Sequence, residues 1–454
     1  MAGYDVTSQQ GSLHVLQITN HGMHEWDMTP GLPDTGGQNV YVNAMTDAMV
    51  RLGHRVTIVN RGGYPNPVTG GPRIGTTHRH GNRARIVYLT DGVPAFVRKE
   101  DMAERIPALA DELTCLLERD GFDLIVSHYW DGALLGVTAN RRLDAPLPHV
   151  WVPHSLGAVK RRNVDETRWA DLRIGERIDH ERAVLEEVDA VVATSDVIRR
   201  SLSDDYGVTA DLLIPPGVDP ARYRPRGDDE CPGMWEYLAE TLGRPVEEVA
   251  GRPVVIEVSR TDTTKRKDVL LEAFAATRQH VPDALLALTI DETDGALRDR
   301  LLEQIGDLGL VDDVVVLGSV WDRLPCLYAM SAAYCTPSVM EGFGMSAAEA
   351  AASGLPVIAS DLVPFAVEYL LGGEPVSVPV PGTPGLLVGD AGIVAPADSV
   401  EAFAAALTMV LTDRALASRL GTAARAVVIP ALTWDHLTAG LLHRIAVRAG
   451  PPGE

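Results

Sequence analysis

The segment Ser338-Val-Met-Glu341-Gly-Phe-Gly344-Met-Ser-Ala-Ala-Glu349 is the most informative stretch of the chain. It follows an apolar run at residues 332–335, typical of a buried strand, and leads through two glycines into a helix-forming stretch. The order strand, turn, helix predicts an α/β fold whose helix N-terminus offers backbone N–H groups and a positive dipole end to a phosphate. Glu341 and Glu349 would repel that phosphate unless they bind hydroxyl groups attached to it. A sugar nucleotide meets this requirement.

Short apolar runs alternate with helical patterns through most of the sequence, which is the pattern of parallel βαβ units. The first series of predicted strands lies at residues 13–18, 55–59, 84–89, 124–127, 149–152 and 190–193. Helices are predicted between them at 39–52, 102–118 and 171–187. A second series of strands lies at 253–258, 284–290, 314–317, 333–336 and 356–359.

A polar, proline-rich stretch between residues 215 and 253 separates the two series. We therefore expect a Rossmann-like N-terminal domain over residues 1–218 and a second Rossmann-like domain over 219–430. A final helical segment is expected within 431–454. Two doubly wound domains would bind ligands in a cleft lined by the carboxyl ends of their strands.

Charge and cysteine content exclude several classes of protein. The net charge of −22 over 454 residues argues against nucleic acid or an anionic membrane as a partner. The four cysteines, at positions 115, 231, 326 and 335, are far apart, which predicts neither a disulfide framework nor a zinc site. No signal-peptide pattern opens the chain and no run of 18 apolar residues occurs in it, so a cytoplasmic protein is expected.

Basic residues at predicted strand ends stand out against this acidic background. Arg260 closes the first strand of the second series and Lys265 follows five residues later, so the two can clamp a diphosphate. Lys267 has weaker support, because it can simply start the next helix. The turn Asp34-Thr-Gly36-Gly37-Gln38 brings backbone amides close to a ligand, but it lacks the Gly-x-Gly-x-x-Gly spacing of a dinucleotide site.

Polar side chains also follow two strands of the first series. His154 comes just after the strand at 149–152, at an edge where ligands bind. His128 and Asp131 follow the preceding strand, where they either hold an acceptor or pack beneath His154. Lys99 and Arg177 add cations suited to a phosphorylated ligand, although Arg177 could equally form an ion pair on a helix surface.

Taken together, these motifs resemble the family 4 glycosyltransferases of the GT-B fold over nearly the whole chain. Within that family the chain is most similar to the sucrose-phosphate synthase and mannosylfructose-phosphate synthase group. The matching segments are Pro33-Asp-Thr-Gly-Gly-Gln-Asn-Val-Tyr-Val42, Ser127-His-Tyr-Trp-Asp131, Pro153-His-Ser-Leu-Gly157, Ile214-Pro-Pro-Gly-Val-Asp219, Ser259-Arg-Thr-Asp262 and Glu341-Gly-Phe-Gly344. The resemblance implies two Rossmann-like domains with doubly wound parallel sheets facing a cleft. It also implies a C-terminal helix that crosses back to the N-terminal domain.

The resemblance also implies roles for the residues singled out above. The N-terminal domain would bind the acceptor and the C-terminal domain the nucleotide sugar. Arg260 and Lys265 would hold the diphosphate and stabilise the leaving group, Glu349 the ribose, and Glu341 the transferred sugar. Further donor contacts would come from Gly36, Gly37, Phe343, Gly344, Met345 and Ser346. His154 would contact the sugar near the reacting centre, and the acceptor would meet Gln38, Lys99, His128, Asp131 and Arg177.

The reaction that this resemblance implies is transfer of a hexosyl group, with retained configuration, from a nucleoside diphosphate sugar to a small acceptor. A sugar phosphate is the first choice of acceptor, and no metal or other cofactor is required. An unphosphorylated acceptor reacting through oxygen or sulfur stays open, as does a catalytically silent nucleotide-sugar-binding protein. Burial or ion pairing of both Lys99 and Arg177 would favour the unphosphorylated acceptor. The base of the donor (UDP or GDP), the sugar and the oligomeric state are not specified.

Overall fold

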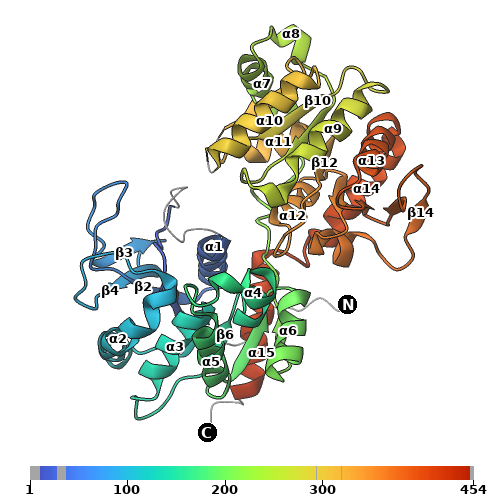
Figure 1. The fold of residues 1–454 in the computed structure, drawn as a ribbon. Helices are drawn as coiled ribbons and strands as arrows, with labels where there is room; N and C mark the ends of the chain where they lie inside the picture. The colour runs from blue at the N-terminus through green and yellow to red at the C-terminus, as the bar shows by residue number, and fades with distance from the viewer. Residues whose placement is uncertain (1–10, 28–36, 293, 319, 450–454) are drawn as a thin grey trace. The chain divides into compact units, whose positions relative to one another are not determined.

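The computed structural model describes residues 11–27, 37–292, 294–318 and 320–449, with side chains described as far as residue 445. The chain forms two compact units, each built around its own sheet (Figure 1). The first unit combines Met1–Gly217 with Trp434–Glu454, and the second is Val218–Thr433. Across the described residues, no helix is both long enough and apolar enough to span a membrane.

The first unit contains an eight-stranded sheet in the order β3-β4-β2-β1-β5-β6-β7-β8. Every neighbouring pair is parallel except β3 and β4. The strands are β1 (His14–Ile18), β2 (Arg55–Arg61), β3 (Gly75–Arg79), β4 (Ala84–Leu89), β5 (Leu124–His128), β6 (His149–Val152), β7 (Ala190–Ala193) and β8 (Leu212–Leu213). Strands β1, β5, β6 and β7 are buried at every position, which explains why most of their residues are apolar.

Helices cover both faces of this sheet. They are α1 (Gly37–Arg51), α2 (Ile106–Asp120), α3 (Tyr129–Asn140), α4 (Gly157–Asn163), α5 (Ile174–Leu185), α6 (Asp196–Tyr206) and α15 (Trp434–Ala449). Val15 points to the face covered by α1 and α15, whereas its neighbour Leu16 packs against α2 and α3 on the other face. This alternation within one strand is how a single sheet supports two apolar cores.

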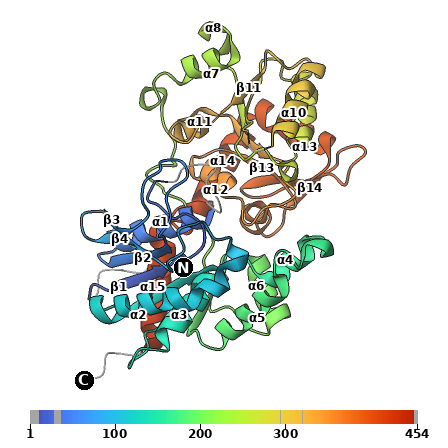
Figure 2. The same cartoon turned by 60° about the vertical axis from the view of Figure 1, so that its left-hand side comes forward.

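The last helix, α15, belongs to the first unit although it follows the whole of the second in sequence. Figures 1 and 2 both show it, in red, among the blue and green elements of the first unit. Its Trp434 ring packs edge-on against Tyr41 of α1 at 4.8 Å, and Asp435 pairs with Arg51 at 2.6 Å. The predicted return of the C-terminal helix to the N-terminal domain is therefore confirmed.

The second unit contains another eight-stranded sheet, in the order β11-β10-β9-β12-β13-β16-β15-β14. It is parallel except at β15, which pairs antiparallel with both of its neighbours. The strands are β9 (Val254–Glu257), β10 (Leu285–Thr289), β11 (Val314–Leu317), β12 (Ala333–Thr336), β13 (Val357–Ser360), β14 (Val376–Val378), β15 (Leu386–Val388) and β16 (Gly392–Ala395).

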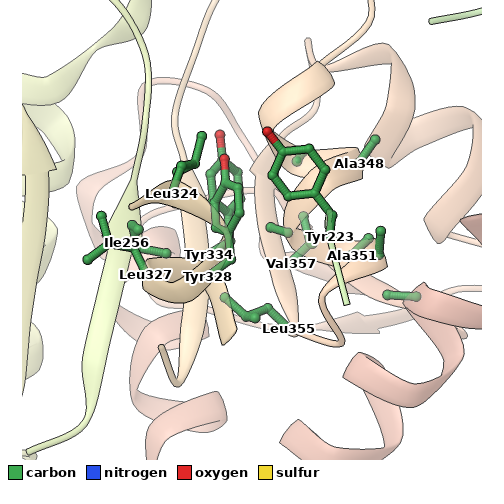
Figure 3. Close-up of a cluster of buried hydrophobic side chains, with 14 of the residues drawn as sticks. Tyr223, Ile256, Leu324, Leu327, Tyr328, Tyr334, Ala348, Ala351, Leu355 and Val357 are labelled. Carbon is green, nitrogen blue, oxygen red and sulfur yellow. The ribbon is translucent and has the colours of Figure 1, made fainter. Parts of the chain in front are cut away.

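Two apolar cores flank this second sheet. One contains α9 (Lys267–Arg278), α10 (Gly295–Asp307) and α13 (Val400–Thr412). The other contains α7 (Met234–Leu242), α8 (Val246–Val249), α11 (Leu324–Met330), α12 (Met345–Ala352) and α14 (Arg414–Val428). Figure 3 shows part of this other core, where the rings of Tyr223, Tyr328 and Tyr334 stand among aliphatic side chains with their hydroxyl groups pointing the same way.

The cysteine prediction is wrong for one pair. Cys231, just before α7, and Cys326, in α11, form a disulfide with their Cα atoms 5.5 Å apart. They are separated by 95 residues and meet because α7 and α11 pack into the same core. Wide spacing in sequence therefore gave no signal of their proximity. Cys115 and Cys335 are unpaired.

Candidate active site

Residues 338–349, together with the apolar run before them, form the predicted strand, turn and helix: β12, a turn and α12. Gly344 precedes α12 with φ of 107°, a conformation that favours glycine. A Cβ atom there would also lie 2.8 Å from Cγ1 of Val363, so the turn has no room for a side chain. Phe343 is buried against the rings of Phe365 and Tyr369, whereas Met345 and Ser346 are half-buried in the first turn. The first N–H groups of α12 are thus held in a fixed direction, where they can bind an anion.

The loop carrying Arg260 and Lys265 is tied to this turn. Asp262 accepts a hydrogen bond from the backbone N–H of Thr264 at 2.8 Å and caps the short 3-10 helix η4 (Thr263–Lys265). The carbonyl of Thr264 then accepts from the backbone N–H of Val339 at 2.8 Å. These bonds bring the ends of β9 and β12 together, as expected for adjacent strands of a parallel sheet.

Lys265 and Glu341 contact each other directly. The Lys265 Nζ lies 2.5 Å from Oε1 of Glu341 and 3.2 Å from the carbonyl oxygen of Met340. The Lys265 side chain is 11% exposed and that of Glu341 is 22% exposed, so the ion pair lies at the edge of the surface. Arg260 is exposed and forms no ion pair with any residue that the structure describes. The Arg260 guanidinium is therefore available to bind a ligand phosphate, whereas the Lys265 ammonium is already paired with the Glu341 carboxylate.

Lys267 has a different place from Lys265. Its side chain is 1% exposed and its Nζ lies 2.5 Å from Oε2 of Glu257 in β9. It also donates to the hydroxyl of Ser259 at 2.9 Å. Lys267 thus joins the start of α9 to β9, in agreement with the interpretation that it starts the helix.

Glu349 lies one turn into α12, within hydrogen-bonding reach of Tyr223 and Tyr328. Burial raises the pKa of this carboxyl to about 7, and Tyr223, Arg222 and Tyr328 oppose part of that rise. Near neutral pH the group is therefore divided between its protonated and ionised forms. An ionised carboxylate accepts hydrogen bonds from a diol about twice as strongly as a neutral acid does.

Because of this pKa, we expect nucleoside diphosphate affinity to increase several-fold between about pH 6 and about pH 8 as Glu349 ionises. The free energy of unfolding should instead decrease as the pH rises. A carboxyl whose pKa is raised by folding stabilises the fold while protonated, and that contribution is lost as the pH rises from the unfolded pKa through about 7. Calorimetric titration with a nucleoside diphosphate at several pH values measures the expected increase in affinity. The Glu349→Gln variant should lose the pH dependence, and an unchanged dependence in that variant would contradict the assignment.

His154 and His128 lie together at the carboxyl edge of the first sheet. Nε2 of His154 is 2.9 Å from Nδ1 of His128, and Nε2 of His128 is 2.9 Å from Oε1 of Gln17. Both nitrogens of His128 are therefore engaged by protein groups, and His128 packs against His154 rather than presenting a nitrogen to an acceptor. His154 has φ of 55° and Tyr129 has φ of 65°. Left-handed backbone at residues other than glycine is concentrated at functional sites.

Asp131 lies next to this pair, in the first turn of α3. It is fully buried, and its Oδ1 is 2.8 Å from Nδ1 of His21. Its Oδ2 is buried without a hydrogen-bond partner among the described residues. Gln38, in the first turn of α1, donates to the hydroxyl of Thr19 at 3.0 Å. Gly37 begins α1, and Gly36 lies outside the described residues.

A small pocket in the first unit gathers two of the predicted acceptor residues. Lys99 and Arg177 line it together with Lys160, Arg173 and Tyr129. Two carboxylates, those of Glu100 and Glu176, line it as well. Four cations therefore gather around one small pocket in a protein whose net charge is −22, although carboxylates behind the lining also pair with them: Glu181 with Arg177, and Glu104 and Asp101 with Arg173. The pocket has room for little more than a water-sized group, so an acceptor phosphate would have to displace side chains at its mouth.

Arg177 is buried rather than exposed. Its guanidinium donates to Oε1 of Glu181 at 2.8 Å, to the Tyr129 hydroxyl at 2.6 Å and to the Ser155 carbonyl at 2.6 Å. Glu181 in turn accepts from the backbone N–H of Gly157 and from the Tyr206 hydroxyl. Arg177 therefore does form an ion pair, which was one of its two predicted roles. The pair with Glu181 is buried, however, and does not lie on a helix surface.

Sequence reasoning did not assign Glu181 or Arg173. Glu181 is four positions after Arg177, the spacing at which side chains of one helix face meet, so this pair could have been predicted. Arg173 gave no such signal, because it enters the pocket through a left-handed backbone conformation (φ of 46°) just before α5.

Comparison with known proteins agrees with this geometry in both units. The family described as Glycosyltransferase Family 4 matches residues 35–222, and the family Glycosyl transferases group 1 matches residues 240–427. The chain is 29% identical to mannosylfructose-phosphate synthase from Agrobacterium fabrum over 361 residues, which cover 76% of this chain and 75% of that protein.

D-inositol 3-phosphate glycosyltransferase from Nocardia farcinica is 30% identical over 427 residues, which cover 91% of this chain and 85% of that protein. The structure of sucrose-phosphate synthase from Thermosynechococcus elongatus superposes with a TM-score of 0.71 at 26% identity, covering 96% of this chain and all of that one. The chain is therefore a glycosyltransferase with the GT-B fold, and it belongs to glycosyltransferase family 4.

Proposed function

We propose that this enzyme transfers a hexosyl group, with retention of configuration, from a nucleoside diphosphate sugar to a small phosphorylated sugar or polyol. The cationic pocket at Lys99, Lys160, Arg173 and Arg177 is the observation that carries the choice of acceptor. A phosphate dianion inside a protein must be paired with cations, and guanidinium groups bind phosphate with directed hydrogen bonds. The relatives described above carry sugar or inositol phosphates in their names, which supports the same choice.

The donor would be held by the second unit. The N–H groups at the start of α12, with Arg260 and Lys265, would bind the diphosphate and stabilise negative charge on it as it leaves. Glu349 would accept hydrogen bonds from the ribose hydroxyls, and Glu341 from those of the transferred sugar. In this scheme the departing phosphate oxygen takes the acceptor's proton, so the protein supplies no separate base.

An unphosphorylated acceptor is the second candidate, and one observation favours it. Arg177 is already paired with Glu181 and is 4% exposed, so part of the pocket's charge is neutralised within the protein. Lys99 is half-buried and also interacts with other protein groups. The gathering of four cations around one small pocket is the reason we place the phosphorylated acceptor first.

Matched pairs of acceptors separate the two candidates. UDP-glucose and GDP-mannose are each offered with fructose 6-phosphate or fructose, and with inositol 3-phosphate or inositol. Two charge-assisted contacts to a phosphate predict at least about a hundredfold preference in kcat/KM for a phosphorylated member. Equal turnover of a phosphorylated and an unphosphorylated partner would establish the second candidate instead. Donor binding without turnover on any acceptor would support a silent binding protein.

Replacing Lys99 with methionine tests the acceptor pocket directly. We expect KM for the phosphorylated acceptor to rise about tenfold or more, with donor hydrolysis unchanged, because one charged partner of the phosphate is lost. Steady-state kinetics at varied acceptor concentration provide the measurement. Arg200→Met is the matched control, since Arg200 lies on α6 with 72% of its side chain exposed and does not line the pocket. A Lys99→Met variant with wild-type KM would place the acceptor phosphate elsewhere.

A further inference from the structure

A chain of buried side chains leads from α1 to His154. The hydroxyl of Thr46 donates to the carbonyl of Val42 at 2.8 Å, and the Gln17 amide donates to the Thr46 oxygen at 2.6 Å. Oε1 of Gln17 is 2.9 Å from Nε2 of His128. Nδ1 of His128 is then 2.9 Å from Nε2 of His154. Thr46, Gln17 and His128 are all fully buried, which keeps bulk water away from the bonds among these three side chains.

The first bond fixes the direction of all the others. Two oxygens 2.8 Å apart need a proton between them, and at Val42 only the Thr46 hydroxyl can supply it. The Thr46 oxygen must then accept from the Gln17 amide, which turns the Gln17 oxygen toward His128. His128 consequently carries its proton on Nε2, and its bare Nδ1 accepts a hydrogen bond from His154.

We infer that Gln17 and His128 are positioning residues that hold His154 with its proton on Nε2, so that its Nδ1 presents a lone pair to a hydroxyl group of the substrate. This inference rests on the proposed function, in which His154 contacts the transferred sugar near the reacting centre. The residue is then a hydrogen-bond acceptor. It cannot donate a proton to the leaving group from Nδ1.

The surroundings of His154 support this assignment. The Tyr41 ring packs edge-on against the His154 ring at 4.8 Å, which fixes the plane of the imidazole. Burial, together with nearby His21, lowers the pKa of His154 to about 3, so the ring is neutral near pH 7. Within the described part of the chain, Nδ1 of His154 makes no hydrogen bond to protein. A neutral ring with one engaged nitrogen leaves the other available to a ligand.

The lone pair on Nδ1 of His154 would determine which substrate groups can bind beside it. A substrate hydroxyl can donate to Nδ1, whereas a deoxy position offers no proton and a carboxylate would be repelled. Reversing the tautomer would reverse this preference, because an Nδ1–H group favours an acceptor. The buried Gln17 side chain, which touches no substrate in this scheme, would thus determine which sugars the enzyme accepts.

Two substitutions at Gln17 separate positioning from packing. In Gln17→Leu, the Nε2–H group of His128 loses its acceptor, so the proton is expected to move to Nδ1 and donate to His154. His154 must then carry its own proton on Nδ1. In Gln17→Glu, burial keeps the carboxyl group protonated, so its O–H group donates to Thr46 while its other oxygen accepts from His128, and the wild-type arrangement should persist.

Long-range proton–nitrogen correlation spectra of the full chain with isotope-labelled histidine report the tautomers without any ligand. His154 is assigned from the signals lost in His154→Asn. Wild type and Gln17→Glu should show His154 protonated at Nε2, and Gln17→Leu should show it protonated at Nδ1. With UDP-glucose or GDP-mannose as donor, kcat/KM should fall about tenfold or more in Gln17→Leu and remain close to wild type in Gln17→Glu.

A wild-type His154 protonated at Nδ1 would overturn the inference, whatever the activity. Loss of activity in Gln17→Leu with an unchanged tautomer would also overturn it, since Gln17 would then act only through packing. Because the spectra need no substrate, these results stay distinct from a failure of the proposed function. That failure would instead appear as wild-type protein that transfers no sugar.

Discussion

The Glu341→Gln variant is expected to bind UDP or GDP more tightly than the wild type, yet to transfer sugar about a hundredfold more slowly. The Glu341 carboxylate lies 2.5 Å from the Lys265 ammonium. A diphosphate that reaches Lys265 must compete with this carboxylate and is repelled by it. Removing the negative charge abolishes both effects, so an affinity gain of about threefold to tenfold for the free nucleotide is expected at this partly exposed site.

The loss of transfer has a separate cause. In the proposed reaction Glu341 accepts hydrogen bonds from the hydroxyls of the transferred sugar, and a neutral amide is a weaker and differently shaped partner. Calorimetric titration with nucleotide alone and turnover with the complete donor measure the two effects independently. Glu374→Gln is the matched control, because Glu374 is exposed and lies far from this turn in sequence. A variant that loses nucleotide affinity and turnover together would contradict the competition between Glu341 and the diphosphate.

The Arg177→Met variant is expected to lose about a hundredfold or more in kcat/KM for a phosphorylated acceptor and to be strongly destabilised. The buried carboxylate of Glu181 would remain without its charged partner, which typically costs about 3–5 kcal/mol. In the double variant Arg177→Met/Glu181→Gln no unpaired charge remains. Its stability should therefore recover in part, while its activity toward the phosphorylated acceptor stays low.

Chemical denaturation and acceptor kinetics of the two single variants and the double variant test this account. Arg182→Met on the same helix is the control, since 59% of the Arg182 side chain is exposed. Equal stability of Arg177→Met and the double variant would mean that Glu181 carries no buried charge. Unchanged acceptor kinetics in both would leave Arg177 with a purely structural role.

Most of the parallel strands could be predicted because they are buried on both faces, although β8 and the fully buried β16 were missed. Val254–Glu257 and Ala333–Thr336 each begin with three consecutive apolar residues, and their order in sequence gave the βαβ pattern. The edge strand β3 was missed, since every residue of Gly75–Arg79 is exposed or half-exposed and its sequence is polar. The antiparallel strands β14 and β15 were missed too. They have three residues each, too few to establish a period.

The sequence indicated which residues belong to the candidate site, but it did not indicate which of their side chains contact one another. Arg260, Lys265 and His154 were proposed as site residues because they follow strands, where parallel sheets bind ligands. The pairing of Lys265 with Glu341 joins residues 76 positions apart, and the bond between His128 and Gln17 spans 111. Such contacts depend on which strands are neighbours, and the sequence alone does not specify strand order.

We expect the second unit to bind a nucleoside diphosphate through Arg260, which is exposed in the loop after β9. Calorimetric titration with UDP and with GDP, on wild type and on Arg260→Ala, tests it most directly. Arg300→Ala, an exposed arginine on α10, is the control. The account predicts tight binding of one of the two nucleotides, weakened about tenfold to a hundredfold in Arg260→Ala and unchanged in the control. Binding of neither nucleotide, or equal affinity in wild type and Arg260→Ala, would contradict it.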